Sequence, residues 1–434
     1  MGNLVIETGY PITFRQEDAQ KLGNYLKDHH SVILVGMKRV GISNFLRFFL
    51  YHKDIIKTYI SPTDKHLFIP VDLNDLVERE IFPFWTLTLK RIADASKRSS
   101  ILDEKTKKEI ETLFLDGISS KDLFLLIDAV RKSLLLIIEN GGFPTLFFLR
   151  FDRIKDAATA EFFDNLRGLK DATHQKMSYA FTSYRSLDYL SPVFIKPSLS
   201  LFAHDMYIRP AKHEDVKTVC SAYQMQYSQI IPKVLSDELH VLVGGHIQYL
   251  QVALIALREQ DLSLTTTKDL FAYLVHDEQI NLQSEELWES LSIPEQEVLS
   301  KVIRNINISM EAKEEAKYLW NMGLLTDGAK RTEIFSPLFS YYVDQKKGKK
   351  VHVTSIEFTK KEHALFSFLQ QRLNEICDRE KIIEAVWPEV TTLGVTDWAI
   401  DRLVARVRNK LKRQNSAFEI QTVKTRGYKL ISIK

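Results

Sequence analysis

At 434 residues the chain is too long for one compact core and suggests about two to four domains. A hydrophobic content of 45% with 26% charged residues is ordinary for a globular protein. No run of about eighteen apolar residues is present, which excludes a membrane-spanning helix, and two distant cysteines argue against a disulfide framework or a zinc site.

The first residues, MGNLVIETGYPITFRQED, lack the basic and then apolar layout of a signal peptide. We therefore expect a cytoplasmic protein with no membrane partner. The net charge of +3 is distributed unevenly, because residues 350–434 carry +6 and residues 1–349 carry −3. A basic tail on a mildly acidic body indicates a nucleic-acid partner for the tail.

Predicted strands and helices alternate over the first half of the chain. Helices are expected at residues 15–29, 43–52 and 157–169, with a largely helical stretch over residues 75–140. Strands are expected at residues 31–35, 67–73, 145–151 and 177–182. This alternation predicts a mostly parallel α/β sheet.

A glycine-containing turn, GMKRVGIS over residues 36–43, directly follows the first buried strand and opens a helix. Backbone N–H groups in this context can hold phosphate, so the turn resembles a P-loop. Ile42 stands where the phosphate-binding lysine belongs, and Lys38 and Arg39 could supply charge instead. The candidate nucleotide-binding residues are Gly36, Lys38, Arg39, Gly41, Ser43 and Asn44.

The segments SVILVGMKRVGISNFLRFFL, LFIPVDLND, TLFFLRFDRI, FFDNLRGLKD and SYAFTSYRSL resemble the ATPase core of AAA+/STAND proteins, particularly bacterial relatives of origin-recognition ATPases. In one register of this resemblance, Leu149 and Arg150 replace the magnesium-binding aspartate and the catalytic glutamate. In the other, Asp152 is the metal acid and Arg153 occupies the glutamate position. Neither register supplies a general base, so we expect no catalytic residues, no metal site and no enzyme activity.

The middle of the chain is predicted to be helical from residue 210 to residue 282, and LVGGHIQYL over residues 242–250 resembles the turn of the family's helical lid. Residues 288–343 are similar to the winged helix that follows the lid in STAND proteins. Its second helix carries Glu311, Glu314 and Glu315, so we interpret it as a packing or interaction module and not as a DNA reader.

The last eighty residues contain an amphipathic cationic helix, TDWAIDRLVARVRNKLKR over residues 396–413, and then two short strands around a basic turn. A helix followed by a basic hairpin is the order of a winged helix-turn-helix. The segment over residues 351–434 resembles the OmpR/PhoB-type domain, because Phe358, Thr359, Glu362, Val386, Trp387, Gly427 and Tyr428 match its motifs.

By position in this resemblance, Arg402 and Arg406 are the candidates for base or groove contacts, and Arg408 and Lys412 for phosphate contacts. Lys424 and Arg426 are the expected wing contacts. Trp398 and Asn409 complete the expected DNA-binding set. Leu403, Thr425 and Trp398 depart from the family pattern, so the resemblance does not carry over a particular DNA sequence.

The expected domains are an NTPase-like core over residues 1–208, a helical lid over 209–284, an internal winged helix over 285–343, a linker over 344–350 and a C-terminal winged helix over 351–434. The fold class is multidomain α/β plus α+β, with a parallel-sheet P-loop core.

We expect a transcriptional regulator that binds double-stranded DNA. The core would be an inert scaffold, or would bind ATP or ADP without hydrolysis. Its other expected role is self-association or contact with a protein partner. The alternatives are a STAND-type ATP-dependent signalling or anti-phage switch and a protein-interaction scaffold that does not bind DNA.

Overall fold

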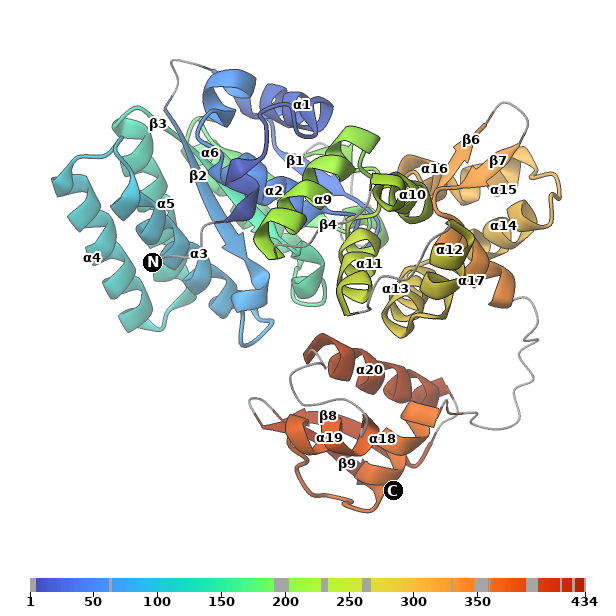
Figure 1. Ribbon diagram of the computed structural model, residues 1–434. Helices are drawn as coiled ribbons and strands as arrows, with labels where there is room; N and C mark the ends of the chain where they lie inside the picture. Colours follow the sequence, from blue (N-terminus) through green and yellow to red (C-terminus); the bar gives the residue numbers. More distant parts are fainter. Residues whose placement is uncertain are drawn as a thin grey trace. The chain divides into compact units, whose positions relative to one another are not determined.

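The chain forms two compact units, Met1–Gly348 and Lys349–Lys434, in a computed structural model (Figure 1). The structure describes residues 5–61, 65–190, 203–227, 233–259, 267–328, 331–346, 358, 360–387, 397–413, 416–423 and 426–432. Within these ranges no helix combines the length and apolarity needed to cross a bilayer.

A five-stranded sheet in the order β2-β3-β4-β1-β5 organises the first unit, and all of its strand pairs are parallel. The strands are β1 (Val32–Val35), β2 (Lys65–Asp72), β3 (Gly142–Leu149), β4 (Ser178–Ser183) and β5 (His204–Tyr207). The predicted parallel α/β sheet is therefore confirmed. Strand β5 was not predicted, because its four residues include His204 and Asp205 and have no apolar pattern.

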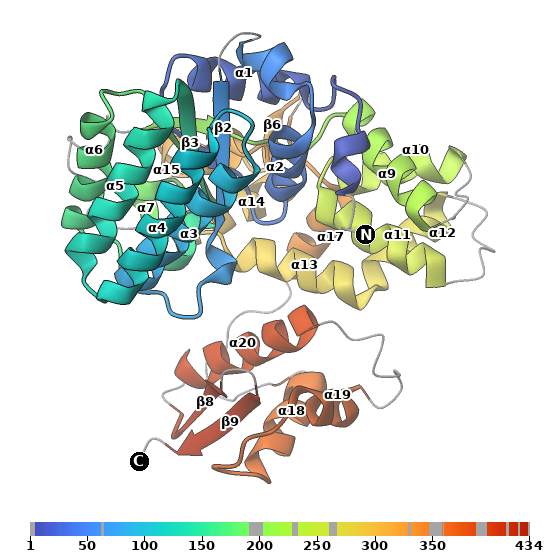
Figure 2. The ribbon, with the colours of Figure 1, turned by 90° about the vertical axis from the view of Figure 1, so that its left-hand side faces the viewer.

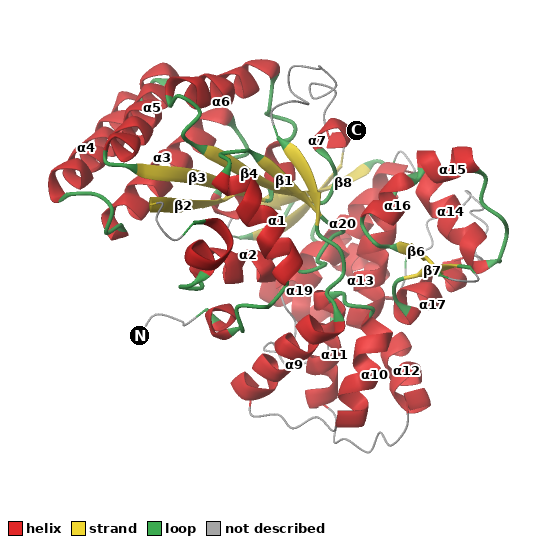
Figure 3. Ribbon diagram, turned by 90° about the horizontal axis from the view of Figure 1, so that it is seen from above, coloured by secondary structure: helices red, strands yellow, loops and turns green. Residues whose placement is uncertain are grey.

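Helices cover both faces of this sheet (Figure 3). They are α1 (Gln16–Lys27), α2 (Ile42–Tyr51), α3 (Ile81–Arg98), α4 (Glu104–Ser120), α5 (Leu123–Glu139), α6 (Ala160–Ala172) and α7 (Leu187–Leu190). The chain moves from β1 to the far edge through α2 and then returns strand by strand. Because crossovers between parallel strands are right-handed, α2 lies on one face and α3 to α6 on the other. Short turns η1 (Ile6–Gly9), η2 (Ile56–Ile60), η3 (Leu73–Asp75) and η4 (Phe151–Ile154) complete the core.

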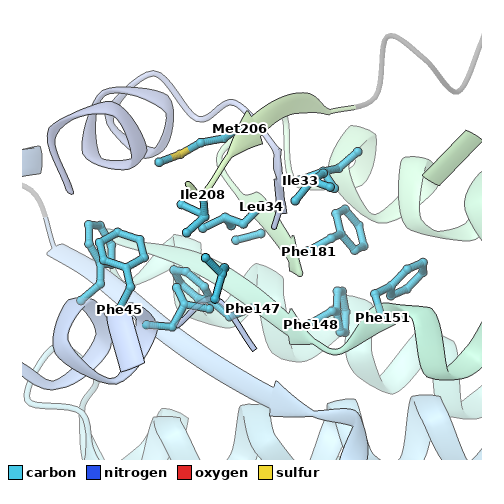
Figure 4. Packing of buried hydrophobic residues seen from close by; sticks show 14 of the residues in the cluster. Ile33, Leu34, Phe45, Phe147, Phe148, Phe151, Phe181, Met206 and Ile208 are labelled. Carbon is cyan, nitrogen blue, oxygen red and sulfur yellow. The ribbon is translucent and has the colours of Figure 1, made fainter. Parts of the chain in front are cut away.

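The core of the first unit is an aromatic and aliphatic layer between the sheet and its helices (Figure 4). Its fully buried strand residues include Leu34, Phe147, Phe148 and Phe181. Phe148 and Phe181 stack with ring centroids 5.6 Å apart, and Phe151 meets Phe181 edge to face at 4.9 Å. The pocket described below lies at the carboxyl ends of β1, β3 and β4.

Five helices form a lid after the sheet, and α9 to α12 gather beside one another (Figures 1 and 2). They are α9 (His213–Tyr227), α10 (Lys233–Val243), α11 (Ile247–Glu259), α12 (Thr267–His276) and α13 (Glu278–Glu289). The turn before α11 contains Gly244 and Gly245, both with positive φ. A Cβ at Gly244 would lie 1.9 Å from the Phe335 carbonyl oxygen, and one at Gly245 would lie 2.2 Å from that of Ala211. Three segments of backbone therefore meet at these two glycines.

The remaining part of the first unit has the helix and hairpin order expected for a winged helix. It contains α14 (Ile293–Ile303), α15 (Met310–Glu315), α16 (Lys317–Asn321), β6 (Leu325–Asp327), β7 (Thr332–Ile334) and α17 (Pro337–Lys346). Two expected boundaries fall inside helices. The boundary after residue 284 lies within α13, and α17 continues to Lys346 in the expected linker, because Leu338, Phe339 and Val343 hold that helix in the core.

The second unit contains α18 (Lys360–Gln370), α19 (Arg379–Val386), α20 (Asp397–Arg413) and the antiparallel hairpin of β8 (Phe418–Val423) and β9 (Gly427–Ser432) (Figure 2). Gly427 has φ +138°, and a Cβ there would lie 2.0 Å from the Cys377 carbonyl oxygen. Cys377 and Tyr428 form a β-bridge at this approach. The helices and the wing share one core that includes Val404, Val407 and Leu430.

Candidate nucleotide pocket and nucleic-acid interface

The glycine-containing turn lies between β1 and α2, where the chain reverses direction across the sheet. Ligands of open parallel sheets bind at such a switch point, outside the carboxyl ends of the strands. Gly41 precedes α2 with φ +117°. A Cβ at Gly36 would lie 2.9 Å from the Ile208 carbonyl oxygen, so close backbone approach requires glycine at this position. Both glycines are therefore needed for the tight turn from β1 into α2.

Ile42, the first residue of α2, places an apolar side chain at the glycine-containing turn. It is half-buried and lies against the glycine turn, where a Cβ at Gly36 would be 3.0 Å from Ile42 Cδ1. Ile42 also lines two neighbouring cavities, of about 540 Å³ and about 420 Å³. Phosphate bound here would therefore depend on backbone N–H groups and on other cations.

The larger cavity brings together all six predicted nucleotide-binding residues, which are Gly36, Lys38, Arg39, Gly41, Ser43 and Asn44. The ends of β3 and β4 and the lid helices α11 and α13 supply the other walls. Lid residues Ile247, Gln248, Gln251 and Glu286 line the same space. The cavity is thus formed between the sheet and the lid.

Both predicted loop cations contact a carboxylate of the lid. Arg39 Nε donates to Glu286 Oε2 at 2.8 Å, and Lys38 Nζ lies 3.9 Å from Glu286 Oε1. Lys38 also sits over the Tyr184 ring at 4.9 Å. The cations expected to face phosphate are therefore already bound to Glu286. Glu286 lies 247 residues after Arg39 in the sequence, so this pairing could not be inferred from spacing.

Asn44 lines the cavity, but its amide serves the packing of the core. It is buried and its Nδ2 donates to Glu7 Oε1 at 3.0 Å and to the Tyr10 hydroxyl at 3.2 Å. The reason is its place in the first turn of α2, on the side that packs against η1. Asn44 therefore lines the predicted pocket while its amide nitrogen is bound to η1 and to Tyr10.

An arginine, Arg150, directly follows β3 at the edge of the cavity. Arg150 has φ +58°, its N–H donates to Thr182 Oγ1 at 2.7 Å, and its guanidinium pairs with Asp72 at 2.5 Å. Burial raises the pKa of the Asp152 carboxyl, while Lys38, Arg153 and Arg150 oppose that shift. Among the described residues, no group of three or more His, Cys, Asp or Glu side chains is placed to hold a metal ion.

His246 connects the lid to the phosphate loop and is fully buried. Its Nδ1 accepts the Tyr249 N–H at 3.2 Å, so Nε2 carries the proton and donates to the Lys38 carbonyl oxygen at 3.0 Å. Burial lowers the pKa of His246 to about 4, and the hydrogen bond to Lys38 opposes that shift. A neutral imidazole therefore fastens the lid to the loop.

Arg185, two residues beyond β4, joins the sheet to the internal winged helix. Its guanidinium makes two 2.6 Å hydrogen bonds to Glu295 and donates to the Ser290 carbonyl oxygen at 2.5 Å. Both side chains of the ion pair are almost completely buried, at 2% and 4% exposure. Glu295 also closes the capping box of α14, with Ser292. Arg185 and Glu295 are 110 residues apart in the sequence, so their pairing could not be inferred from spacing.

The cationic helix α20 uses two of its basic residues to attach itself to α18. Glu362 is fully buried and accepts from Arg406 Nε at 2.9 Å and from Lys410 Nζ at 2.5 Å. Arg406 lies beside the buried stripe of Leu403 and Val407, so it faces the neighbouring helix. Arg406, predicted to read bases, thus makes an ion pair with α18 in this structure.

Arg408, on the other flank of α20, binds the wing. Its Nε donates to the Ile420 carbonyl oxygen and its Nη2 to Thr422 Oγ1, both at 2.7 Å. Arg408, a predicted phosphate contact, therefore ties the hairpin to the helix in this structure. Arg426, in the turn between β8 and β9, is exposed as expected for a wing contact.

The other predicted DNA contacts cannot be placed as side chains. Trp398, Arg402, Asn409 and Lys412 belong to α20, but their side chains lie outside the described part of the structure. Lys424 lies outside the described residues altogether. At about 100° per residue, positions 398, 402 and 409 fall on the side of the helix opposite its buried stripe.

Residues 353–430 match the family described as "Transcriptional regulatory protein, C terminal". No curated protein matches the chain. The chain is similar to the Walker-type ATPase PABY2304 of Pyrococcus abyssi, with 15% identity over 76% of this chain and 95% of that chain, and a TM-score of 0.49.

It is also similar to the ORC2 protein of Aeropyrum pernix in ADPNP and ADP complexes, with 11% identity over 79% of this chain and 96% of that one, and a TM-score of 0.46. The chain is also similar to the ORC1 protein of Aeropyrum pernix in complex with DNA, with 11% identity over 79% of this chain and 95% of that one, and a TM-score of 0.40. The second unit therefore contains an OmpR/PhoB-type winged helix of the transcriptional regulator family, joined to a unit built on a five-stranded parallel sheet.

Proposed function

We propose that this protein is a transcriptional regulator that reads duplex DNA with α20 and the β8–β9 wing. The observation that carries the proposal is the match of residues 353–430 to the regulator family. The basic residues of α20 support it, because some bind other parts of the unit and others lie on the opposite side of the helix. Arg406 and Arg408 hold the helix to α18 and to the wing. Arg402 and Asn409, on the opposite side of the helix, are the proposed base contacts, with Lys412 and Arg426 at phosphate.

The DNA proposal is tested by duplex binding at several salt concentrations. Phosphate contacts release counterions, so the affinity should fall steeply as salt rises, and Arg402→Ala with Lys412→Ala should weaken binding. Arg372→Ala is the matched control, because Arg372 is a cation of the same unit that donates to the Phe368 carbonyl within α18. Absence of duplex binding at low ionic strength would contradict the proposal.

For the N-terminal unit, we propose a control module that binds ATP or ADP without hydrolysing it. The glycine backbone of the phosphate loop and the 540 Å³ cavity support binding. The Arg150–Asp72 ion pair supports the lack of turnover, since it places a cation at the strand end that usually holds the metal. We infer that binding is independent of Mg²⁺.

Titration calorimetry of the full chain with ADP and ATP, with and without Mg²⁺, tests this second part. Equal affinities with and without the metal are expected. ATP turnover that requires Mg²⁺ and exceeds that of an Arg150→Ala control would favour an ATP-driven switch instead. Self-association or a protein partner through the first unit stays a prediction, which sedimentation velocity with and without ADP would test.

A further inference from the structure

Glu286 holds the place of an anion at the phosphate loop. It lies in the last turns of α13, and its carboxylate contacts Arg39 at 2.8 Å and Lys38 at 3.9 Å. The Glu286 side chain is 12% exposed, against 34% for Arg39 and 31% for Lys38. The carboxylate is therefore the inner member of the cluster, and both cations fold over it.

Two further contacts close the lid at the same turn. His246 donates to the Lys38 carbonyl oxygen, and Ile247 covers Gly41 so closely that a Cβ there would lie 2.5 Å from Ile247 Cγ1. The lid thus contacts residues 38 to 41 in three ways. Glu286 makes the ion pair, His246 donates the hydrogen bond and Ile247 makes the apolar contact.

A phosphate group entering this turn would need the same two cations as Glu286. It would also meet the like charge of that carboxylate at close range in a partly buried site, which is unfavourable. Since Ile42 supplies no ammonium, Lys38 and Arg39 are the cations of the loop itself, and a polyphosphate cannot bind them while Glu286 does.

We propose that Glu286 is an internal competitor for phosphate, so that nucleotide diphosphate or triphosphate binds only when α13 releases the loop. This inference rests on the nucleotide-binding part of the proposed function. The occupied state loses the Glu286–Arg39 contact, and the lid contacts of His246 and Ile247 loosen with it. Glu286 thereby sets both the affinity of the pocket and the position of the lid.

Release of Glu286 has a direct route to the internal winged helix. Ser290 caps the C-terminal end of α13, one turn after Glu286, and its carbonyl oxygen accepts from Arg185. The same guanidinium binds Glu295 of α14. A shift of α13 therefore acts on the buried ion pair that joins the sheet to the winged helix.

Calorimetric titration of the full chain with ADP in metal-free buffer tests the competition. Glu286→Gln keeps the size of the side chain and removes its charge, and it should bind ADP about tenfold more tightly than the unmodified protein. Glu289→Gln is the matched control, because this exposed residue lies on the same helix and should leave the affinity unchanged. Arg39→Gln also frees the lid but removes a phosphate partner, so it should not bind ADP more tightly.

Amide hydrogen exchange gives a second readout that needs no ligand. Peptides over residues 36–44 and 244–251 should exchange faster in Glu286→Gln than in Glu289→Gln, and adding ADP to the unmodified protein should raise exchange over residues 244–251. Equal ADP affinities of the unmodified protein and Glu286→Gln would overturn the competition but leave the pocket in place. Failure of every variant to bind ADP would overturn both the competition and the proposed nucleotide pocket.

Discussion

Arg406→Ala separates a structural role for this arginine from a role in reading DNA. Glu362 is fully buried, and the Arg406 side chain that pairs with it is only 13% exposed. Removing Arg406 takes one cation away from the buried carboxylate, which keeps its ion pair with Lys410. Breaking a buried pair from one side typically costs about 3 kcal/mol, so opening of the second unit should become roughly a hundredfold more frequent.

Two measurements on the full chain decide between the roles. Hydrogen exchange of peptides over residues 400–413 should speed up markedly in Arg406→Ala, while the slope of log affinity for duplex DNA against log salt should stay unchanged. Arg426→Ala is the converse control, because this exposed wing cation should leave exchange unaltered and reduce the slope by about 0.9. Normal exchange in Arg406→Ala together with a shallower salt slope would refute the structural assignment and restore Arg406 as a DNA contact.

Three other substitutions test the geometry elsewhere. Gly427→Ala should destabilise the hairpin by about 1 to 3 kcal/mol from backbone strain alone. The effect should be seen as faster amide hydrogen exchange in β8 and β9. Unchanged thermal stability of this variant would contradict the close approach to Cys377. Arg185→Met should cost the first unit about 3 to 5 kcal/mol in urea unfolding, and Glu295→Met on the same chain should recover part of it; strict additivity of the two losses would deny the coupling. The pKa of His246 is lowered from 6.5 to about 4, so the unfolded chain binds more protons between these values. Stability of the first unit should therefore fall as the pH drops from about 6.5 to about 4, and less steeply in His246→Gln; identical pH profiles would argue against the buried neutral imidazole.

The central sheet could be predicted because its strands are short apolar runs between helical segments. Strand β1 is buried at every position, as its sequence indicates. Strand β5 could not be predicted, because it joins the sheet through backbone pairing with β1 and only Met206 of its residues is buried. An apolar pattern in the sequence indicates a buried strand. An edge strand whose side chains do not alternate between apolar and polar has no such pattern.

The location of the candidate sites along the chain could be predicted, but the residues that pair with each other in them could not. Spacing located the phosphate loop and the cationic helix, and both lie where the sequence indicated. Spacing gave no information on Glu286 or Glu362, because each reaches its cations from another element of the fold. The ion pair of Arg406 with Glu362 was not predicted for this reason, since helical periodicity identifies the buried stripe but not the partner beside it.

The close backbone contacts at Gly244 and Gly245 determine where the chain can be shortened without loss of folding. These glycines touch the segment before α9 and the end of the β7 hairpin, so core, lid and internal winged helix are interleaved. Truncation after residue 208 or 284 would strip contacts from what remains, and the second cut also falls inside α13. We therefore expect neither shortened product to fold autonomously, whereas the division between residues 348 and 349 separates two units that each retain their own core.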